Sequence, residues 1–171
     1  MIAAMALAVV LQMSNAAGAP AKTIAAAEAQ VARMFHEIGV DVAWRSAADS
    51  GADNEVIRVV LIPYETRGLR QRRFPAMGAA LRVSPRTRVA YVFFRQIEDE
   101  ASRHVVSATL VLACAIAHEL GHLLLPDDGH SASGLMRAVW DRDDFCRANQ
   151  GQLRFLPEQA ARIRGLATSA Y

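Results

Sequence analysis

The sequence has little lysine, little cysteine, few aromatic residues and no long apolar run. Lys22 is its only lysine beside 18 arginines, and the net charge of +2 gives no argument for a nucleic-acid or acidic partner. No apolar stretch reaches the ~20 residues that span a bilayer, so we expect no stable membrane insertion. Two cysteines exclude a disulfide framework, and 53% hydrophobic residues exclude a disordered chain.

The cysteines and an arginine-rich segment have plain interpretations. Cys114 and Cys146 could pair, but we favour two free thiols, with Cys114 buried in a helix. Residues 64–75 contain four arginines without an aromatic platform, so a solvated loop is a better interpretation than a nucleic-acid surface. Neither feature points to a function.

The apolar pattern predicts alternating strands and helices along a single domain, since the 171 residues are about one domain's length. Helices are predicted at residues 22–38, 104–125 and 156–167. Strands are predicted at residues 40–45, 55–62, 76–83 and 88–94. Residues 97–101 are expected to be an acidic connection and residues 127–139 a loop. The second helix is very apolar, so we expect it to be buried on most sides and to end at Pro126.

The apolar N-terminus has two interpretations. Residues 1–19 resemble a signal peptide with small residues near a cleavage site, although the first residues lack Lys and Arg. Alternatively, residues 6–13 form a buried first strand that ends in a turn-prone segment. The compartment stays undetermined, with a secreted or periplasmic location favoured.

The most specific feature is the segment His118-Glu119-Leu120-Gly121-His122 inside the apolar helix. Residues four apart on a helix project from one face, so His118 and His122 can share one metal ion. Neutral imidazole is a good zinc ligand, and Glu119 is placed to act as general base on zinc-bound water. Chance expects only about 0.007 such patterns in a chain with five histidines and eight glutamates.

A catalytic zinc needs a third protein ligand and one open position. The candidates are Asp127, Asp128 and His130, because Pro126 and Gly129 let the chain turn back after the helix. We rank His130 first, since an imidazole matches the other two ligands. Asp128 is the second choice, and a solvated turn is the other interpretation of the two aspartates.

Together these residues resemble the metzincin clan of zinc metallopeptidases, in a matrixin-like or archaemetzincin-like form. The segments that carry the resemblance are residues 118–122, Gly129-His130-Ser131 and Leu135-Met136. The resemblance implies zinc held by His118, His122 and His130, with Glu119 as general base and Met136 in a tight turn, the Met-turn, beneath the metal.

One departure from the clan concerns the spacing after His122. The clan usually has Gly three residues after the second His and its third ligand six residues after. Here Leu125 and Asp128 stand at those places, and His130 follows eight residues after His122. The connection to the third ligand would therefore be two residues longer than in the standard families.

The resemblance also implies a fold of mixed α/β (α+β) class. It is a twisted, mixed five-stranded sheet packed on two long helices, with a zinc-binding helix, the Met-turn and a C-terminal helix. The predicted elements follow this order if residues 6–13 are the first strand, which is why we favour that interpretation. Residues 1–171 would form one catalytic domain, with a sheet-and-helix part at 1–125 and a small C-terminal part at 126–171.

The expected function is a zinc-dependent endopeptidase acting as a monomer on peptide or protein substrates. The resemblance implies that strand 76–83 is the rim to which a peptide adds as an extra strand. The alternative is a catalytically silent zinc-binding module of the same fold, and the intact Glu119 favours the enzyme because a structural site needs no base.

Cys114 and the segment from Trp140 to Asp144 are weaker candidates for residues of the metal site. Cys114 lies four residues before His118 on the same helical face, but we expect a packed thiol there. Trp140 precedes Asp141, Asp143 and Asp144, which could line a pocket or bind calcium. Three nearby acidic residues more often cap a helix, and their spacing does not match a calcium loop.

Overall fold

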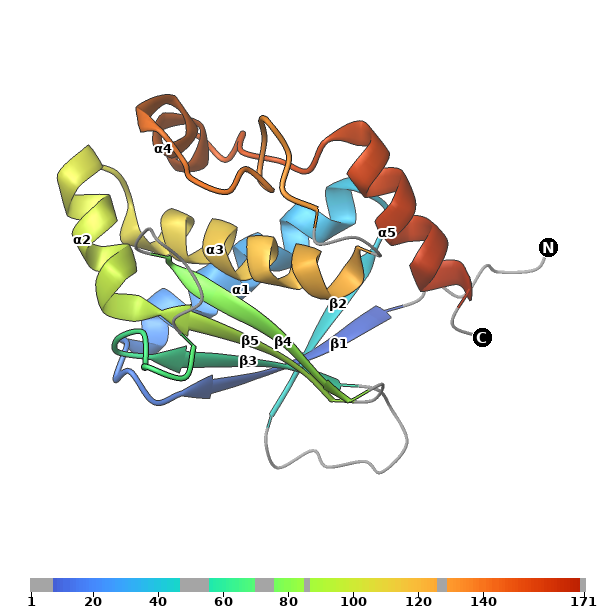
Figure 1. Ribbon diagram of the computed structural model, residues 1–171, viewed down its shortest axis with the longest axis horizontal. Coiled ribbons are helices and arrows are strands. Elements are labelled where there is room, and N and C mark those ends of the chain that lie inside the picture. The colour runs from blue at the N-terminus through green and yellow to red at the C-terminus, as the bar shows by residue number, and fades with distance from the viewer. Residues whose placement is uncertain (1–7, 47–55, 70–75, 85–86, 126–128, 170–171) are drawn as a thin grey trace.

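The computed structural model describes residues 8–46, 56–69, 76–84, 87–125 and 129–169. Within these residues the fold is mixed α/β, with five strands and five helices (Figure 1). The strands are β1 (Ala8–Asn15), β2 (Asp41–Arg45), β3 (Val56–Ile62), β4 (Gly78–Ser84) and β5 (Thr87–Phe93). The helices are α1 (Ala21–Glu37), α2 (Phe94–His104), α3 (Ala108–Leu124), α4 (Arg142–Asn149) and α5 (Pro157–Ser169).

The five strands form one mixed sheet in the order β2-β1-β3-β5-β4. Strand β1 is parallel to both β2 and β3, and β3 is parallel to β5, whereas β4 runs antiparallel to β5 at the edge. The strand interpretation of the N-terminus is therefore confirmed at residues 8–15, where Leu11 is fully buried. The first two residues of that predicted strand lie outside the described part of the chain.

The two long helices α1 and α3 lie on the same side of the sheet (Figure 1). Helix α1 contacts β2, α3 contacts β4 and β5, and the two helices contact each other. Period-two burial in β3 explains this packing, because Ile57 and Val59 point into the core while Arg58 between them is exposed. The helix α1 buries Val31 and Phe35 at the i, i+4 spacing of a single face.

Helix α3 is buried all round, as its composition predicts. Every residue from 111 to 123 is buried, including the three polar residues of the His-Glu-His motif. Its first turn is capped by the Ser107 hydroxyl, which accepts a hydrogen bond from the Leu110 amide at 3.4 Å. A central helix of this kind holds its polar side chains rigidly, because close-packed neighbours leave them little freedom.

Two expectations about the region before α3 were wrong. Residues 97–101 are not a connection but the middle of α2, which buries Ile97 and Ala101 on one face. The predicted helix 104–125 starts later, because His104 ends α2 and Val105 adopts a left-handed conformation with φ of 56°. The three acidic residues of α2 obscure its short apolar stripe in the sequence, which is why the pattern there indicates a connection and not a helix.

Helix α4 was not predicted, although its cap was. The Asp141 carboxylate accepts hydrogen bonds from the Asp143 and Asp144 amides at 2.9 and 3.1 Å. In return, Asp144 accepts from the Asp141 amide at 3.1 Å, completing a capping box. The helix-cap interpretation of these acidic residues is thus confirmed, and they begin a helix rather than surround a cation.

The structure also bears on two further expectations from the sequence, the state of the cysteines and the presence of membrane-spanning helices. Cys114 and Cys146 are both free thiols, the first buried and the second exposed, as expected. Among the helices that the structure describes, none combines the length and the apolar character required to cross a bilayer.

Candidate metal centre

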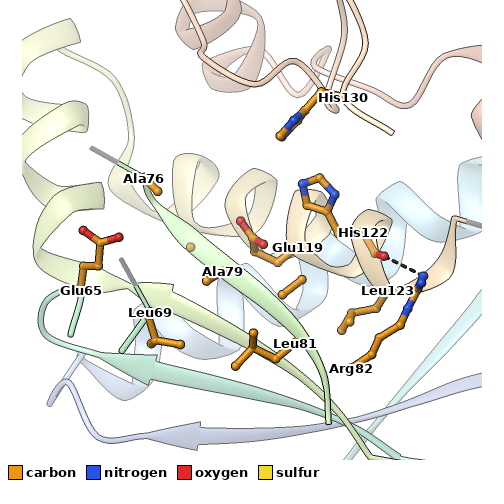
Figure 2. Close-up of a pocket in the computed structure, with 12 residues that line it drawn as sticks. Glu65, Leu69, Ala76, Ala79, Leu81, Arg82, Glu119, His122, Leu123 and His130 are labelled. Atoms are coloured by element: carbon orange, nitrogen blue, oxygen red, sulfur yellow. Dashed lines mark hydrogen bonds between the residues drawn. The ribbon is translucent and has the colours of Figure 1, made fainter. Parts of the chain in front are cut away.

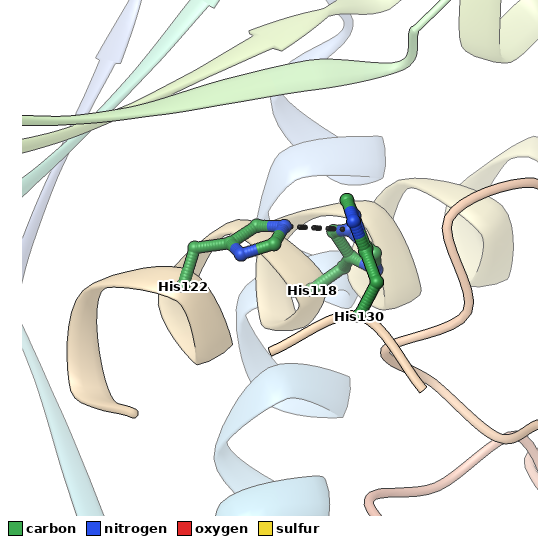
Figure 3. Close-up of side chains that lie close together, drawn as sticks. All are labelled: His118, His122 and His130. Carbon is green, nitrogen blue, oxygen red and sulfur yellow. Dashed lines mark hydrogen bonds between the residues drawn. The ribbon is translucent and has the colours of Figure 1, made fainter. Parts of the chain in front are cut away.

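Three histidines converge at one point beside α3. His118 and His122 occupy successive turns of the helix, and His130 reaches them from the loop that follows it (Figure 3). Their ligand atoms all lie within 4.8 Å of one another, and the Nε2 atoms of His118 and His122 are 3.1 Å apart. The three side chains are close enough to bind a single metal ion.

The tautomer of His118 is set by a backbone carbonyl. Its Nδ1 lies 2.8 Å from the Leu135 oxygen. Because a carbonyl can only accept, Nδ1 carries the proton and the neutral ring presents the lone pair of Nε2 toward the other histidines. The Trp140 indole also donates to the Leu135 oxygen, at 3.2 Å. The segment after His130 therefore orients a ring on α3.

The polar groups of the centre are mostly withdrawn from water. His118 and His122 are 8% and 9% exposed and Glu119 is 6% exposed, whereas His130 is exposed. Removing imidazoles and a carboxylate from water costs free energy, which a bound cation would offset by taking up the imidazole lone pairs. The donor set of the centre fits a divalent ion that prefers nitrogen ligands.

Met136 packs directly beneath the metal-site helix. It belongs to a turn closed by the Arg137 amide, which donates to the Gly134 carbonyl at 3.1 Å. A Cβ at Gly121 would lie 3.0 Å from Met136 Cε and closer still to its sulfur. The fully buried Met136 therefore needs glycine at position 121, between the two helical ligands.

Glu119 is held against the edge strand β4. A Cβ on Gly78 would lie 2.7 Å from Glu119 Cγ and 2.8 Å from its Oε1. The strand can pass this close to the carboxylate only because Gly78 has no side chain. Sequence reasoning missed Gly78, although an isolated glycine in a strand pattern is a signal of close approach.

A cleft of about 320 Å³ opens between β4 and α3, next to the histidines. Figure 2 shows Glu119 and His122 projecting from α3 into it, with His130 facing them from the loop. Its lining residues come from the segment after β3, from β4, from α3 and from the His130 loop: Glu65, Leu69, Ala76, Gly78, Ala79, Ala80, Leu81, Arg82, Glu119, His122, Leu123 and His130. The cleft therefore runs along the edge strand and contains the general-base candidate and two of the three histidines.

Arg82 links the cleft rim to the end of α3. Its Nη2 donates to the His122 and Leu125 carbonyls at 2.9 and 2.7 Å. The His122 carbonyl is in the last turn of α3, where carbonyls lack intrahelical partners and carry the negative end of the helix dipole, and Leu125 is the residue that caps the helix. A contact between residues forty positions apart leaves no local sequence signal, so Arg82 was not predicted.

Of the other residues considered as metal ligands, the structure describes Cys114, whereas Asp127 and Asp128 lie outside the described residues. Cys114 is buried among apolar side chains, and this burial raises its pKa to about 12. The Cys114 thiol therefore stays protonated at neutral pH, and it lies outside the three-histidine group.

Comparison with known proteins gives no further guidance. No protein-family model matches this chain, and no curated protein matches it. The function must be argued from the site, because one fold can carry many activities.

Proposed function

We propose that this protein is a zinc-dependent endopeptidase with a metzincin-like catalytic domain. The observation that carries the proposal is the convergence of His118, His122 and His130 beside a cleft that also contains Glu119. This is the set of parts needed for hydrolysis by metal-activated water: an ion site, a carboxylate base and space for a chain.

The ligand set favours a catalytic zinc. Tetrahedral zinc with nitrogen ligands at 2.0–2.1 Å separates the ligand atoms by about 3.3 Å. The 3.1 Å between Nε2 of His118 and of His122 is close to that separation. The three histidines found among the described residues would leave a fourth position for water, whereas structural zinc sites usually fill all four. When bound, zinc supplies a Lewis acid that polarises a carbonyl and lowers the pKa of water.

Glu119 would do the proton chemistry. It directly follows His118 on the helix, so its carboxylate faces the cleft without being one of the three clustered ligands. As general base, an Oε atom removes the proton from the attacking water and then delivers it to the leaving amine of the peptide. Contact with β4 at Gly78 limits the positions that this carboxylate can take.

The substrate would lie along β4. Among the described strands, β4 pairs with β5 alone and lies at the edge of the sheet. Backbone donors and acceptors on its outer edge could pair with an extended peptide. Ala79 and Ala80 line the β4 side of the cleft, and their small side chains would leave space there for a peptide. A peptide paired there passes Glu119 and His122 in mid-chain, which favours cleavage inside a chain over removal of terminal residues.

The deciding experiment combines metal analysis with a peptide-library digest, with and without a chelator. We expect about one zinc per chain and chelator-sensitive cleavage. Glu119→Gln should retain zinc and lose about 10²–10⁴-fold in cleavage rate. Glu65→Gln is the matched control, because it removes another carboxylate of the same cleft. Zinc-loaded Glu119→Gln protein that cleaves at the wild-type rate would contradict the role of Glu119.

Two further outcomes have definite meanings. Zinc-loaded wild-type protein that cleaves no peptide in the library would indicate the catalytically silent zinc-binding module. His130→Ala should lose most of its zinc, and a full complement of metal in that variant would assign the third ligand to Asp128 instead.

A further inference from the structure

His130 is the least secured of the three histidines. His118 and His122 lie on a buried helix, but His130 is exposed and comes from a loop after the end of α3. A ligand on a loop holds its ion only if other contacts keep the loop in place. The contacts of its neighbour Ser131 therefore contribute to holding His130 in place.

Ser131 anchors the loop through both its backbone and its side chain. Its amide donates to the Met136 carbonyl at 3.0 Å, and its hydroxyl donates to the Ser133 carbonyl at 2.8 Å. The hydroxyl oxygen also accepts a hydrogen bond from Gln159 Nε2 at 3.2 Å. Only the last of these bonds reaches outside the loop, and it leads to helix α5.

Both the oxygen and the nitrogen of the Gln159 side-chain amide form hydrogen bonds. It is 8% exposed, and its Oε1 accepts from the Leu156 amide at 3.0 Å. A backbone N–H can only donate, so the oxygen must face Leu156 and the NH₂ group must face Ser131. The bond to Leu156 is one half of a capping box at the start of α5.

A pocket opens between the His130 loop and α5 on one side of this bond. A cavity of about 160 Å³ separates them, lined by Leu125, Gly129, His130, Glu158, Gln159 and Arg162. The hydrogen bond from Gln159 Nε2 to the Ser131 hydroxyl joins the two sides of this pocket, the His130 loop and α5.

We propose that Gln159 is a positioning residue for the third metal ligand. Its bond to Ser131 ties the adjacent His130 to the C-terminal helix and keeps the imidazole within reach of His118 and His122. The helix α5, which supplies no ligand, thereby slows the loss of the metal. This inference rests on the proposed zinc site but not on peptide cleavage.

The principal test is Gln159→Glu. A glutamate keeps an oxygen for the Leu156 amide, so the cap of α5 survives, but it has no N–H to donate to Ser131. We expect zinc to leave this variant about fivefold faster in a chelator-competition assay, as the loss of one hydrogen bond predicts. The added negative charge would by itself slow zinc release, so faster release cannot be an electrostatic effect.

Ser131→Ala tests the other end of the bond. It removes the acceptor of the Gln159 N–H, and with it the hydroxyl's bond to the Ser133 carbonyl, without changing charge. It should also release zinc at least about fivefold faster. Ser133→Ala is the matched control, because it deletes a hydroxyl in the same loop and leaves the carbonyl that Ser131 uses. The double variant Gln159→Glu with Ser131→Ala should be no faster than Ser131→Ala alone, since the bond that Gln159→Glu breaks is already absent in Ser131→Ala.

The failures of the two proposals can be told apart. If wild-type protein holds zinc, and if Gln159→Glu and Ser131→Ala release it at the wild-type rate, the positioning role is wrong and the zinc site stands. If wild-type protein binds no zinc, the proposed function fails. Amide exchange of metal-free protein then decides the loop contact, because exchange at Ser131 should be faster in Gln159→Glu. Unchanged exchange would overturn the inference.

Discussion

Replacing Gly78 with alanine should displace Glu119, the proposed general base, while leaving the three clustered histidines in place. The new Cβ would lie 2.7 Å from both Tyr91 O and Glu119 Cγ, where ordinary contacts begin at 3.4 Å. The Tyr91 oxygen is backbone of the paired strand β5, so it cannot retreat without widening the sheet. The strand and Glu119 must therefore separate by about 0.7 Å, and the carboxylate moves.

The expected magnitudes follow from these overlaps. Overpacking costs about 1–3 kcal/mol, and exchanging glycine for alanine in a strand returns about 0.5–1 kcal/mol. The free energy of unfolding should therefore fall by about 1–2 kcal/mol. A displacement of 1 Å can cost about 10²-fold in rate, so the cleavage rate should fall by roughly 10- to 10²-fold with zinc content unchanged.

The assay compares Gly78→Ala with Gly68→Ala by urea unfolding, zinc content and cleavage rate. Gly68 is the control because a Cβ there would meet no atom within 4 Å. Its variant should match wild-type protein in all three measurements, within a few tenths of a kcal/mol for unfolding. Wild-type stability and cleavage in Gly78→Ala would refute the argument that β4 confines Glu119.

Two further predictions concern stability. Val105, 88% exposed, holds the left-handed position that closes α2, which costs a β-branched residue about 1–2 kcal/mol. Val105→Gly should therefore raise the free energy of unfolding by about 0.5–1 kcal/mol, whereas Val83→Gly in the extended strand β4 should lower it by a similar amount. Hydrogen bonds from the Arg137 guanidinium and from the Asp144 amide lower the pKa of Asp141. A carboxyl with a lowered folded pKa stabilises above its unfolded value of about 3.9, and this contribution is lost as pH falls through the folded pKa. Thermal unfolding between pH 7 and 2.5 should show this loss in wild-type protein and in Asp143→Asn. It should be smaller in Asp141→Asn, which keeps a capping oxygen but not the charge.

Much of the fold was predictable because its main signals are local. The strands β3 and β5 appear as β-branched and aromatic runs, and α1 appears as an apolar stripe of period 3.6. The short helices α2 and α4 were not predicted because their sequences are rich in charged residues and carry few apolar ones. The three buried residues of α2, Phe94, Ile97 and Ala101, are too few to distinguish an apolar stripe from a loop until the core that covers them is known.

The sequence by itself determined that His118 and His122 share a helix face with Glu119 one position away, because helical geometry converts a spacing of four into a direction in space. It also ranked His130 as their partner, on chemical type alone. Only the tertiary structure decided that His130 comes within reach of them, that the Leu135 carbonyl orients His118, and that Gly78 and Gly121 admit their neighbours. These contacts join residues that are distant in the chain, and their distances depend on how whole elements pack.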